Sequence, residues 1–302
     1  MTTPGRKRGF SPSWVVAAVL VLGFVAILTV AGFGSVRAGN DAGARPPGPT
    51  DAVPDSVLEG GPWVDTIHTP VSSRNLPPKT IALTFDDGPD PTWTPQVVAV
   101  LRKHHVPATF FVVGSNVSRY PDLVRDIRDA GSELGVHTFA HPDLGNVSPW
   151  RMQRELDETQ LAIAGSAGVT TYLLRPPYSS TADAVDDLGY RTVQAAGALG
   201  YVTVFTTQDS EDWQRPGVAA VIANATPRAD DPNGAVVLMH DAGGDRSETV
   251  AALDQYIPQM LAKGYRFTTV TAGFAMPAAI LSSTVARLRM LQPNEPMSRS
   301  WR

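Results

Sequence analysis

Two adjacent aspartates, Asp86 and Asp87, stand directly after the apolar run 81–85 and before the turn-forming pair Gly88-Pro89. Neighbouring residues of an extended strand point to opposite sides, so the two carboxylates can serve different purposes. Carboxylates held this close at a strand end are costly unless a cation lies against them. A plain turn without a chemical role has the same composition. The pair alone therefore leaves a site and a turn equally open.

Two histidines, His137 and His141, form a second group that could do chemistry. On a helical turn, a spacing of four places both imidazoles on one face, where they can share a metal ion. With 6 His in 302 residues, chance would give roughly 0.1 such pairs, which makes the pair suggestive but not decisive. The alternative is two surface histidines on a turn that bind no metal. Two imidazoles plus a carboxylate from the pair at 86 and 87 make a metal site with positions left for water.

Three further motifs each follow an expected strand: Arg-Pro-Pro-Tyr at 175–178, Asp-Ser-Glu-Asp-Trp at 209–213 and Leu-Met-His-Asp at 238–241. Alone, they would be a Pro-rich turn, a solvated acidic loop and a strand end with a structural histidine. In a β/α barrel, however, the active site is built from loops at the carboxyl ends of the strands. All five groups occupy such positions, which favours one shared site.

The elements that must position these residues alternate along the chain after residue 79. Strands are expected at 80–85, 108–113, 134–136, 172–174, 192–195, 202–206, 235–239 and 266–270, and helices at 94–105, 121–130, 149–165 and 249–263. This alternation predicts parallel β/α units arranged as an open sheet or a barrel. The sequence has no Gly-rich dinucleotide loop or phosphate loop, which argues against those ligands.

The N-terminal part has a different character. Three basic residues at 6–8 precede an uncharged apolar run over 14–34 that is long enough to cross a bilayer. The basic cluster predicts a cytoplasmic segment 1–13 and an extracytoplasmic remainder. A cleaved signal peptide is the alternative, although the run exceeds the usual core of roughly 7–15 residues. The Pro- and Gly-rich segment 35–79 then predicts a linker, followed by a catalytic domain over 80–274.

Composition limits the chemistry. The chain has 302 residues, 43% of them hydrophobic, a net charge of −4 and no cysteine. Disulfides, thiolate metal sites and a cysteine nucleophile are therefore excluded, and the acidic balance argues against a nucleic-acid surface. A metal site must use His, Asp or Glu, which favours a borderline or hard divalent ion. The tail 275–302 has apolar residues spaced like one face of a helix.

The five motifs together, in this order over about 80–270, resemble the polysaccharide deacetylases, the NodB-like or family 4 carbohydrate esterases. The resemblance implies an α/β fold, a distorted (β/α)7 barrel. The apolar run over 14–34 predicts one transmembrane helix before this domain. It also implies removal of acetyl groups from N-acetylglucosamine polymers, or O-acetyl groups from xylan, with a divalent metal. Zinc is the ion we expect, although a His₂Asp ligand set does not separate it from cobalt or other divalent ions.

The resemblance also implies roles for individual residues. Asp87, His137 and His141 bind the metal. Asp86 is the general base and Arg175 orients it.

The other half of the implied site protonates the leaving group and holds the substrate. His240 is the general acid, tuned by Asp212. The backbone N–H of Tyr178 helps to hold the oxyanion, and Trp213 and Leu238 line the pocket for the acetyl methyl group.

The function we expect is deacetylation of an amino-sugar polymer, peptidoglycan or chitin-like, by an enzyme anchored in the plasma membrane with its catalytic domain outside. Cleavage of the N-terminal segment would make it a secreted enzyme instead. An O-acetyl xylan esterase shares the motifs and remains an alternative. A carbohydrate-binding pseudoenzyme on the same fold is a second one, disfavoured because the acid, the base and all three metal positions are intact.

Overall fold

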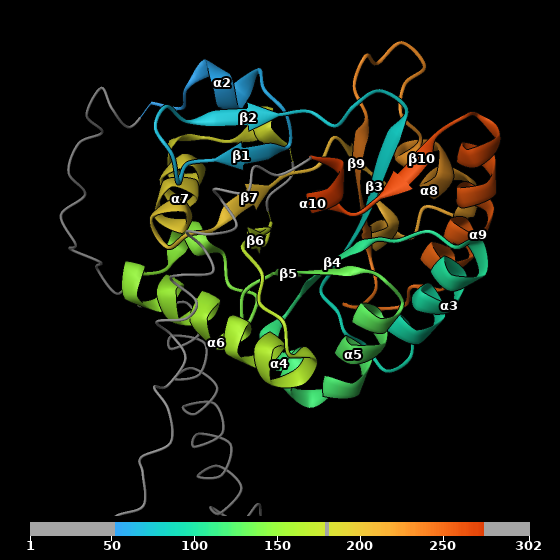
Figure 1. Cartoon of the computed structure of the whole chain (residues 1–302), viewed down its shortest axis with the longest axis horizontal. Coiled ribbons are helices and arrows are strands. Elements are labelled where there is room, and N and C mark those ends of the chain that lie inside the picture. Colours follow the sequence, from blue (N-terminus) through green and yellow to red (C-terminus); the bar gives the residue numbers. More distant parts are fainter. Residues whose placement is uncertain (1–51, 179–180, 275–302) are drawn as a thin grey trace, which may run out of the picture. The chain divides into compact units, whose positions relative to one another are not determined.

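A computed structural model describes residues 52–178 and 181–274 (Figure 1). Its strands form one sheet. They are β1 (Trp63–Asp65), β2 (Ser72–Arg74), β3 (Thr80–Asp86), β4 (Thr109–Val112), β5 (Glu133–Val136), β6 (Leu173–Leu174), β7 (Val202–Val204), β8 (Gln208–Asp209), β9 (Ala235–His240) and β10 (Arg266–Thr268). The strand order is β2-β1-β7-β6-β5-β4-β3-β9-β8, and β10 pairs with β3 outside this path.

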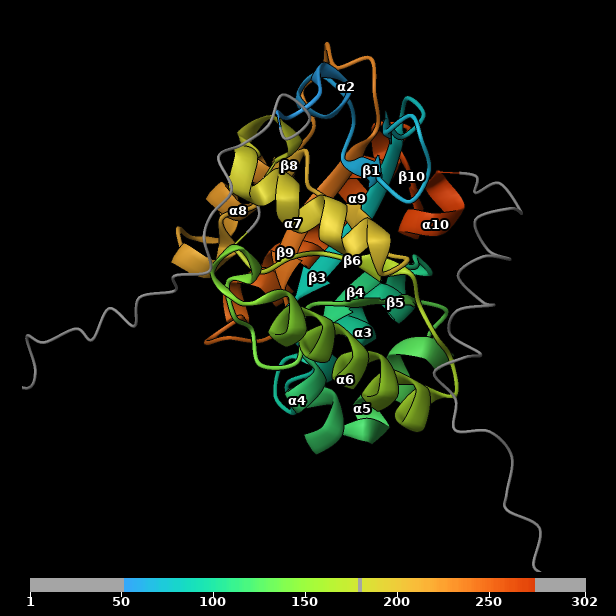
Figure 2. The ribbon, with the colours of Figure 1, turned by 90° about the vertical axis from the view of Figure 1, so that its left-hand side faces the viewer.

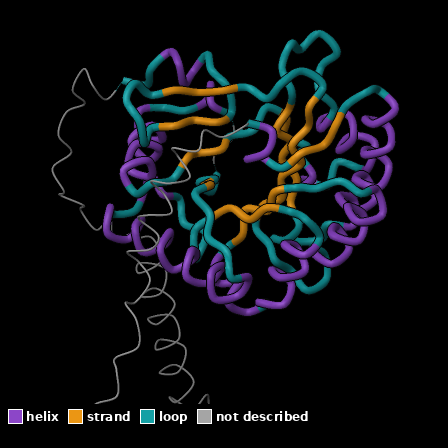
Figure 3. The backbone as a smooth tube through the Cα atoms, viewed as in Figure 1, coloured by secondary structure: helices purple, strands orange, loops and turns teal. Residues whose placement is uncertain are grey.

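Helices surround the outside of the curled sheet (Figure 3). They are α2 (Asp55–Leu58), α3 (Thr94–His104), α4 (Gly114–Arg119), α5 (Pro121–Asp129), α6 (Pro149–Ala167), α7 (Asp187–Ala198), α8 (Val218–Ala225), α9 (Ser247–Ala262) and α10 (Val270–Gly273), with the short 3₁₀ helices η1 (Leu144–Asn146), η2 (Ala182–Ala184) and η3 (Asp212–Gln214). Of these, α6 packs on β5 and α7 on β7, as Figures 1 and 2 show.

Strand β3 is the centre of the sheet. All of its residues are buried, and it pairs in parallel with β4, β9 and β10. The register sets Asp86 opposite Phe111 on one side and His240 on the other. The carboxyl ends of these strands therefore meet at one edge, as parallel pairing requires. The parallel β/α arrangement predicted from the alternation of elements is confirmed.

The sheet curls into a half-barrel. Strands β2 and β8 are the two ends of the strand order, and no ladder joins them within the described ranges. The closed seven-stranded ring that a barrel would require is therefore not formed. Two features account for this: the antiparallel pair β1–β2 occupies the edge beside β7, and β8 has only two residues to offer a partner.

Side chains of β3 alternate between two hydrophobic clusters. Ile81, Leu83 and Phe85 belong to the large core beneath the helices, whereas Ala82 belongs to a second cluster on the inner face of the curled sheet. This is the period of two expected for a strand buried on both faces. By the same alternation, Asp86 points to the inner face.

The predicted linker over 35–79 is wrong in its described part. Residues 55–74 include α2, β1 and β2, and β1 pairs antiparallel with β7. Trp63 is fully buried there, with its ring centroid 6.2 Å from that of Tyr172 and 5.0 Å from that of Phe274. Val57, Val64 and Leu76 are also buried in this segment, which the Pro- and Gly-rich composition did not indicate.

The predicted strand over 192–195 is also wrong, because these residues lie inside α7. Asp186 caps that helix by accepting a hydrogen bond from Gly189 N. Thr192 and Val193 suggested a strand through their β-branched side chains, but they are buried on one face of the helix together with Tyr190. Tertiary packing here outweighs local propensity.

The predicted cytoplasmic segment 1–13, the membrane span 14–34 and the tail 275–302 lie outside the described residues. Among the helices of the described part, none combines the length and the apolar character that crossing a bilayer requires.

Candidate metal centre and active site

Three side chains meet at the carboxyl edge of the sheet in the arrangement of a metal site. Ligand atoms of Asp87, His137 and His141 all lie within 4.8 Å of one another. Asp87 Oδ1 lies 3.5 Å from His137 Nε2 and 3.2 Å from His141 Nε2. Asp87 directly follows β3, and His137 directly follows β5. The structure thus brings together the three residues expected to bind the metal.

The backbone between the two histidines differs from the expected helical turn. Residues 137–141 form an irregular loop in which Thr138 and His141 adopt left-handed φ angles of 66° and 57°. Asp87 is left-handed as well, with φ 76°. Such angles are uncommon for residues other than glycine and persist where surrounding contacts impose them. The imidazoles converge because the loop folds back on itself.

Buried Glu155 of α6 holds this loop. Its Oε2 accepts hydrogen bonds from the backbone N–H groups of Phe139 at 2.8 Å and Ala140 at 2.7 Å. Its Oε1 lies 2.6 Å from Arg151 Nη2. The helix thereby fixes the segment that carries both histidine ligands. Sequence reasoning missed Glu155, although an acidic residue beside Leu156 on the apolar face of a helix is an indication of such a role.

The tautomer of His137 suits metal binding. Its Nδ1 lies 2.7 Å from the backbone oxygen of Arg175, to which the Nδ1–H donates. The lone pair of Nε2 is then free to face Asp87. Metal-binding histidines are commonly oriented by such a hydrogen bond from the other ring nitrogen.

The electrostatics of the cluster also fit a cation. Burial alone would raise the pKa of Asp87, but the neighbouring imidazoles of His137 and His141 outweigh it and hold the pKa of Asp87 well below its usual range. The hydrogen bond to Asp87 raises the pKa of His141. An ionised carboxylate thus attracts positive charge to this point. One carboxylate and two imidazoles are donors that a borderline divalent ion accepts, so the residues fit the implied metal.

Asp86 lies in a buried ion pair. Its Oδ1 accepts a hydrogen bond from Arg175 Nη1 at 2.8 Å, and the same nitrogen donates to Thr84 Oγ1 at 2.8 Å. Arg175 is fully buried, with its guanidinium carbon 4.3 Å from the ring centroid of Phe111. The other oxygen of Asp86, Oδ2, lies 3.8 Å from His137 Nε2. One carboxylate oxygen is therefore held by Arg175 while the second faces the metal centre.

His240 forms the other half of the site, on the strand next to Asp86. Its Nδ1 lies 2.7 Å from Asp212 Oδ1, and its backbone N–H donates to Asp212 Oδ2 at 2.8 Å. Thr249 Oγ1 donates to the same Oδ2 at 2.7 Å. Burial alone would lower the pKa of His240, but the hydrogen bond and the charge of Asp212 outweigh it and raise that pKa to about 9. His240 therefore carries a proton at neutral pH.

The residues expected around the substrate lie at the mouth of the site. The Tyr178 side chain is 75% exposed and its ring edge faces His141, with the centroids 4.9 Å apart. Trp213 is 55% exposed, whereas Leu238 is buried. Two of these three side chains are therefore accessible aromatic rings, which combine an apolar face with a polar group.

Contacts that the sequence did not indicate hold the loop after β3. Asn116 Nδ2 donates to the backbone oxygen of Asp87 at 2.9 Å. The fully buried carboxyl of Asp241 accepts a hydrogen bond from Thr94 Oγ1 at 2.5 Å, and Thr94 Oγ1 accepts from Asp90 N at 2.7 Å. Burial raises the pKa of Asp241 to about 7. Polar residues of this kind become recognisable only once the loop and its neighbours are placed together.

Comparisons with known proteins agree with this geometry. A family model described as polysaccharide deacetylase matches residues 73–204. A peptidoglycan-N-acetylglucosamine deacetylase of Bacillus cereus is 40% identical over 195 residues, covering 64% of this chain and 87% of that protein. A chitooligosaccharide deacetylase of Sinorhizobium fredii is 34% identical over 218 residues, covering 67% of this chain and 94% of that protein. The crystal structure of a peptidoglycan N-acetylglucosamine deacetylase superposes with a TM-score of 0.59 at 31% identity, covering 66% of this chain and 89% of that one.

Proposed function

This chain belongs to the polysaccharide deacetylase family, and we propose that it is a metal-dependent hydrolase that removes N-acetyl groups from a polymer containing N-acetylglucosamine and releases acetate. The observation that carries the proposal is the meeting of three groups at one edge of the sheet. They are the Asp86–Arg175 pair, the cluster of Asp87 with two histidines, and protonated His240. Together they supply a base, a metal site and an acid.

Asp87, His137 and His141 would hold the metal, and zinc is the ion we propose because two imidazoles and one carboxylate form a common catalytic zinc site. When bound, the ion polarises the acetyl carbonyl and makes a water molecule more acidic. Cobalt and other divalent ions use the same donors.

Asp86 takes the proton of the attacking water. The free oxygen Oδ2 faces the metal centre, and Arg175 fixes the carboxylate through Oδ1. Arg175 thus orients the base through this hydrogen bond.

Two donors complete the reaction. The Tyr178 N–H donates to the oxygen of the tetrahedral intermediate, a contribution typically worth roughly 10²–10³ in rate. His240 protonates the departing nitrogen, worth on the order of 10²–10⁴. Asp212 keeps His240 protonated and oriented. We expect Leu238 and Trp213 to line the pocket for the acetyl methyl group.

Acetate release tests the proposal. Purified protein supplied with zinc should release acetate from chitooligosaccharides or peptidoglycan fragments, and mass spectrometry should show loss of acetyl groups. If the masses of both polymers stay unchanged after incubation, the proposal is overturned and a binding protein without catalytic activity is favoured. Faster cleavage of O-acetyl xylan than of either amide substrate would favour the esterase alternative.

We also propose that residues 14–34 anchor the enzyme in the plasma membrane with the catalytic domain outside. The uncharged length of this run and the basic residues before it support the proposal. Blotting the membrane-bound mature protein for an N-terminal tag tests it. A tag missing from the mature protein would indicate a cleaved signal peptide and a secreted enzyme.

A further inference from the structure

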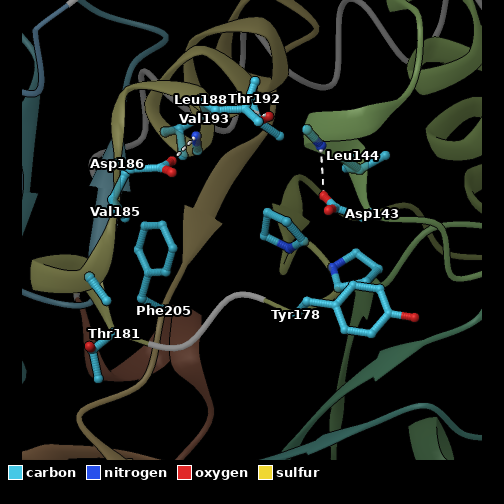
Figure 4. A pocket seen from close by; sticks show the side chains of 15 residues that line it. Asp143, Leu144, Tyr178, Thr181, Val185, Asp186, Leu188, Thr192, Val193 and Phe205 are labelled. Atoms are coloured by element: carbon cyan, nitrogen blue, oxygen red, sulfur yellow. Dashed lines mark hydrogen bonds between the residues drawn. The ribbon is translucent and has the colours of Figure 1, made fainter. Parts of the chain in front are cut away.

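A cavity of about 290 Å³ lies beside the metal centre (Figure 4). Three stretches of chain form its wall: residues 143–145 at η1, residues 176–178 after β6, and parts of 181–193 around η2 and the first turns of α7. Phe205, just after β7, closes one side. None of the roles assigned above uses this cavity except through Tyr178, which belongs to both places.

The cavity continues the catalytic site. Pro176 and Pro177 line it and directly follow Arg175, which holds the base. The ring of Tyr178 lines it too, while its edge contacts the metal-site residue His141. Tyr178 therefore lies between the candidate metal centre and the cavity, so a polymer bound at the metal centre would meet this cavity next to it.

The lining suits a single sugar unit. Leu188, which is 43% exposed, offers apolar surface for the C–H face of a sugar ring, and the nearly buried Leu144 and Phe205 complete the apolar lining. Thr181 and Thr192 bring hydroxyl-bearing side chains to the wall. An apolar wall with a few polar groups is typical of small-ligand sites. The volume lies near the lower end of the roughly 300–1,000 Å³ seen for such sites, which matches one sugar rather than several.

The charged residues on the rim of the cavity are both acidic. Figure 4 shows Asp143 and Asp186 on opposite sides of the cavity. Asp143 accepts a hydrogen bond from Gly145 N at 2.9 Å and Asp186 one from Gly189 N at 2.7 Å. Among the described residues that line the cavity there is no Lys, Arg or His. A ligand that brings its own carboxylate would meet two like charges without a compensating cation.

We propose that this cavity is the subsite for the sugar next to the reacting N-acetylglucosamine, and that it selects an uncharged hexosamine over one that bears a carboxylate. The inference rests on the proposed deacetylase function and deepens it: the favoured substrate is a stretch of neutral N-acetylglucosamine units. A glycan in which every second sugar carries a free carboxylate is disfavoured.

Filling the cavity tests the subsite. Leu188 is 43% exposed, so Leu188→Trp can fill the space without disturbing the core. The KM for a neutral chito-tetramer should rise about tenfold, while hydrolysis of an activated phenyl acetate, which needs only the metal centre, should stay unchanged. Leu161→Trp is the matched control, because Leu161 on α6 is 57% exposed and lies outside the lining. Equal KM values of the two variants for the tetramer would overturn the assignment of this cavity as a subsite.

Removing the charge tests the selectivity. Asp143→Asn with Asp186→Asn removes both negative charges, and Asn caps helices as well as Asp does. The ratio of kcat/KM for the neutral tetramer to that for an alternating N-acetylglucosamine–N-acetylmuramic acid tetramer with free carboxylates should fall about three- to tenfold. High salt should narrow the same ratio in the unaltered enzyme. An unchanged ratio would overturn the proposed selectivity. Failure of the proposed function would look different, because no acetate would be released from any polymer.

Discussion

Asp86 and Asp87 are chemically identical, and their partners separate their roles. Asp86 accepts a hydrogen bond from a buried guanidinium, whereas Asp87 lies between two imidazoles. The alternation of a strand directs one toward Arg175 and the left-handed backbone at residue 87 directs the other toward the histidines. Two adjacent carboxylates with the same side chain therefore lie in different surroundings, one in an ion pair with Arg175 and the other in a candidate metal site.

Substitutions should separate metal binding from proton transfer. Asp87→Ala or His141→Ala removes a ligand, so metal content and activity should be lost together. His240→Ala leaves the ligand set intact and should retain the metal while activity falls on the order of 10²–10⁴. Metal analysis of each purified variant alongside acetate release measures both quantities. A fully active His240→Ala protein would contradict the assignment of the acid.

The pH dependence should report the pair formed by His240 and Asp212. Asp212 raises the pKa of His240 to about 9, so Asp212→Asn should move the alkaline limb of the activity profile to lower pH. The sign for stability follows from the same shift. Because the pKa of His240 is higher in the folded chain, its contribution to stability is fully present below about pH 6.5, down to the acid range in which Asp212, whose own pKa is lowered, becomes protonated. That contribution is lost as pH rises through about 9. Activity profiles with matching alkaline limbs in both proteins would speak against this coupling.

At the scale of residues, the sequence indicated the candidate site residues that the structure brings together, but not the contacts that support their loops. Asp86, His137 and Arg175 were recognisable because reactive residue types follow apolar strands. Glu155 was not, because its role depends on which loop lies over α6. Residue type and spacing identify the chemistry, whereas supporting contacts depend on tertiary structure.

Among the elements, α6 has the clearest link to the site, since it fixes the loop that carries both histidines. Glu155→Gln replaces one carboxylate oxygen with an NH₂ group. The side chain then loses either its hydrogen bonds from the loop N–H groups or its ion pair with Arg151. Supporting changes of this kind typically cost about 10–100-fold in metal affinity. Zinc competition with a chelator should show this loss.

A matched control lies on the same helix. Glu158 pairs with Arg154 at the surface, where an ion pair contributes about 0–1 kcal/mol. Glu158→Gln should therefore leave zinc affinity unchanged. Equal zinc affinities of the two variants would show that α6 does not position the histidine loop.

Element types were predictable where period and length agreed. Strand β3 and helices α3 and α9 lie within two residues of their expected bounds. Two of the failures have clear physical causes: α7 contains β-branched residues that pack well within a helix, and β1 is only three residues long. A strand this short has no alternating pattern that the sequence could reveal, and it becomes evident only from the strands with which it pairs.

In the molecule as a whole, the antiparallel pair β1–β2 completes the sheet on the side of β7, opposite in the strand order to β9 and β8. Trp63 is its main anchor: it contacts Tyr172 beside β6 and Phe274 after α10. The catalytic domain is therefore built from segments on both sides of the expected boundary at residue 80. Stability of the site should depend on a residue that carries no chemistry.

Trp63→Ala should lower the free energy of unfolding by about 3–5 kcal/mol, the usual cost of removing a large buried aromatic side chain. Trp63→Phe should cost less, because it keeps most of the ring and removes an indole N–H that has no hydrogen-bond partner within the described residues. Denaturant unfolding of the metal-loaded protein measures both, with Trp150→Ala as the control, since Trp150 is 66% exposed. Comparable decreases in the free energy of unfolding for Trp63→Ala and Trp150→Ala would show that packing of the N-terminal strands does not stabilise the domain.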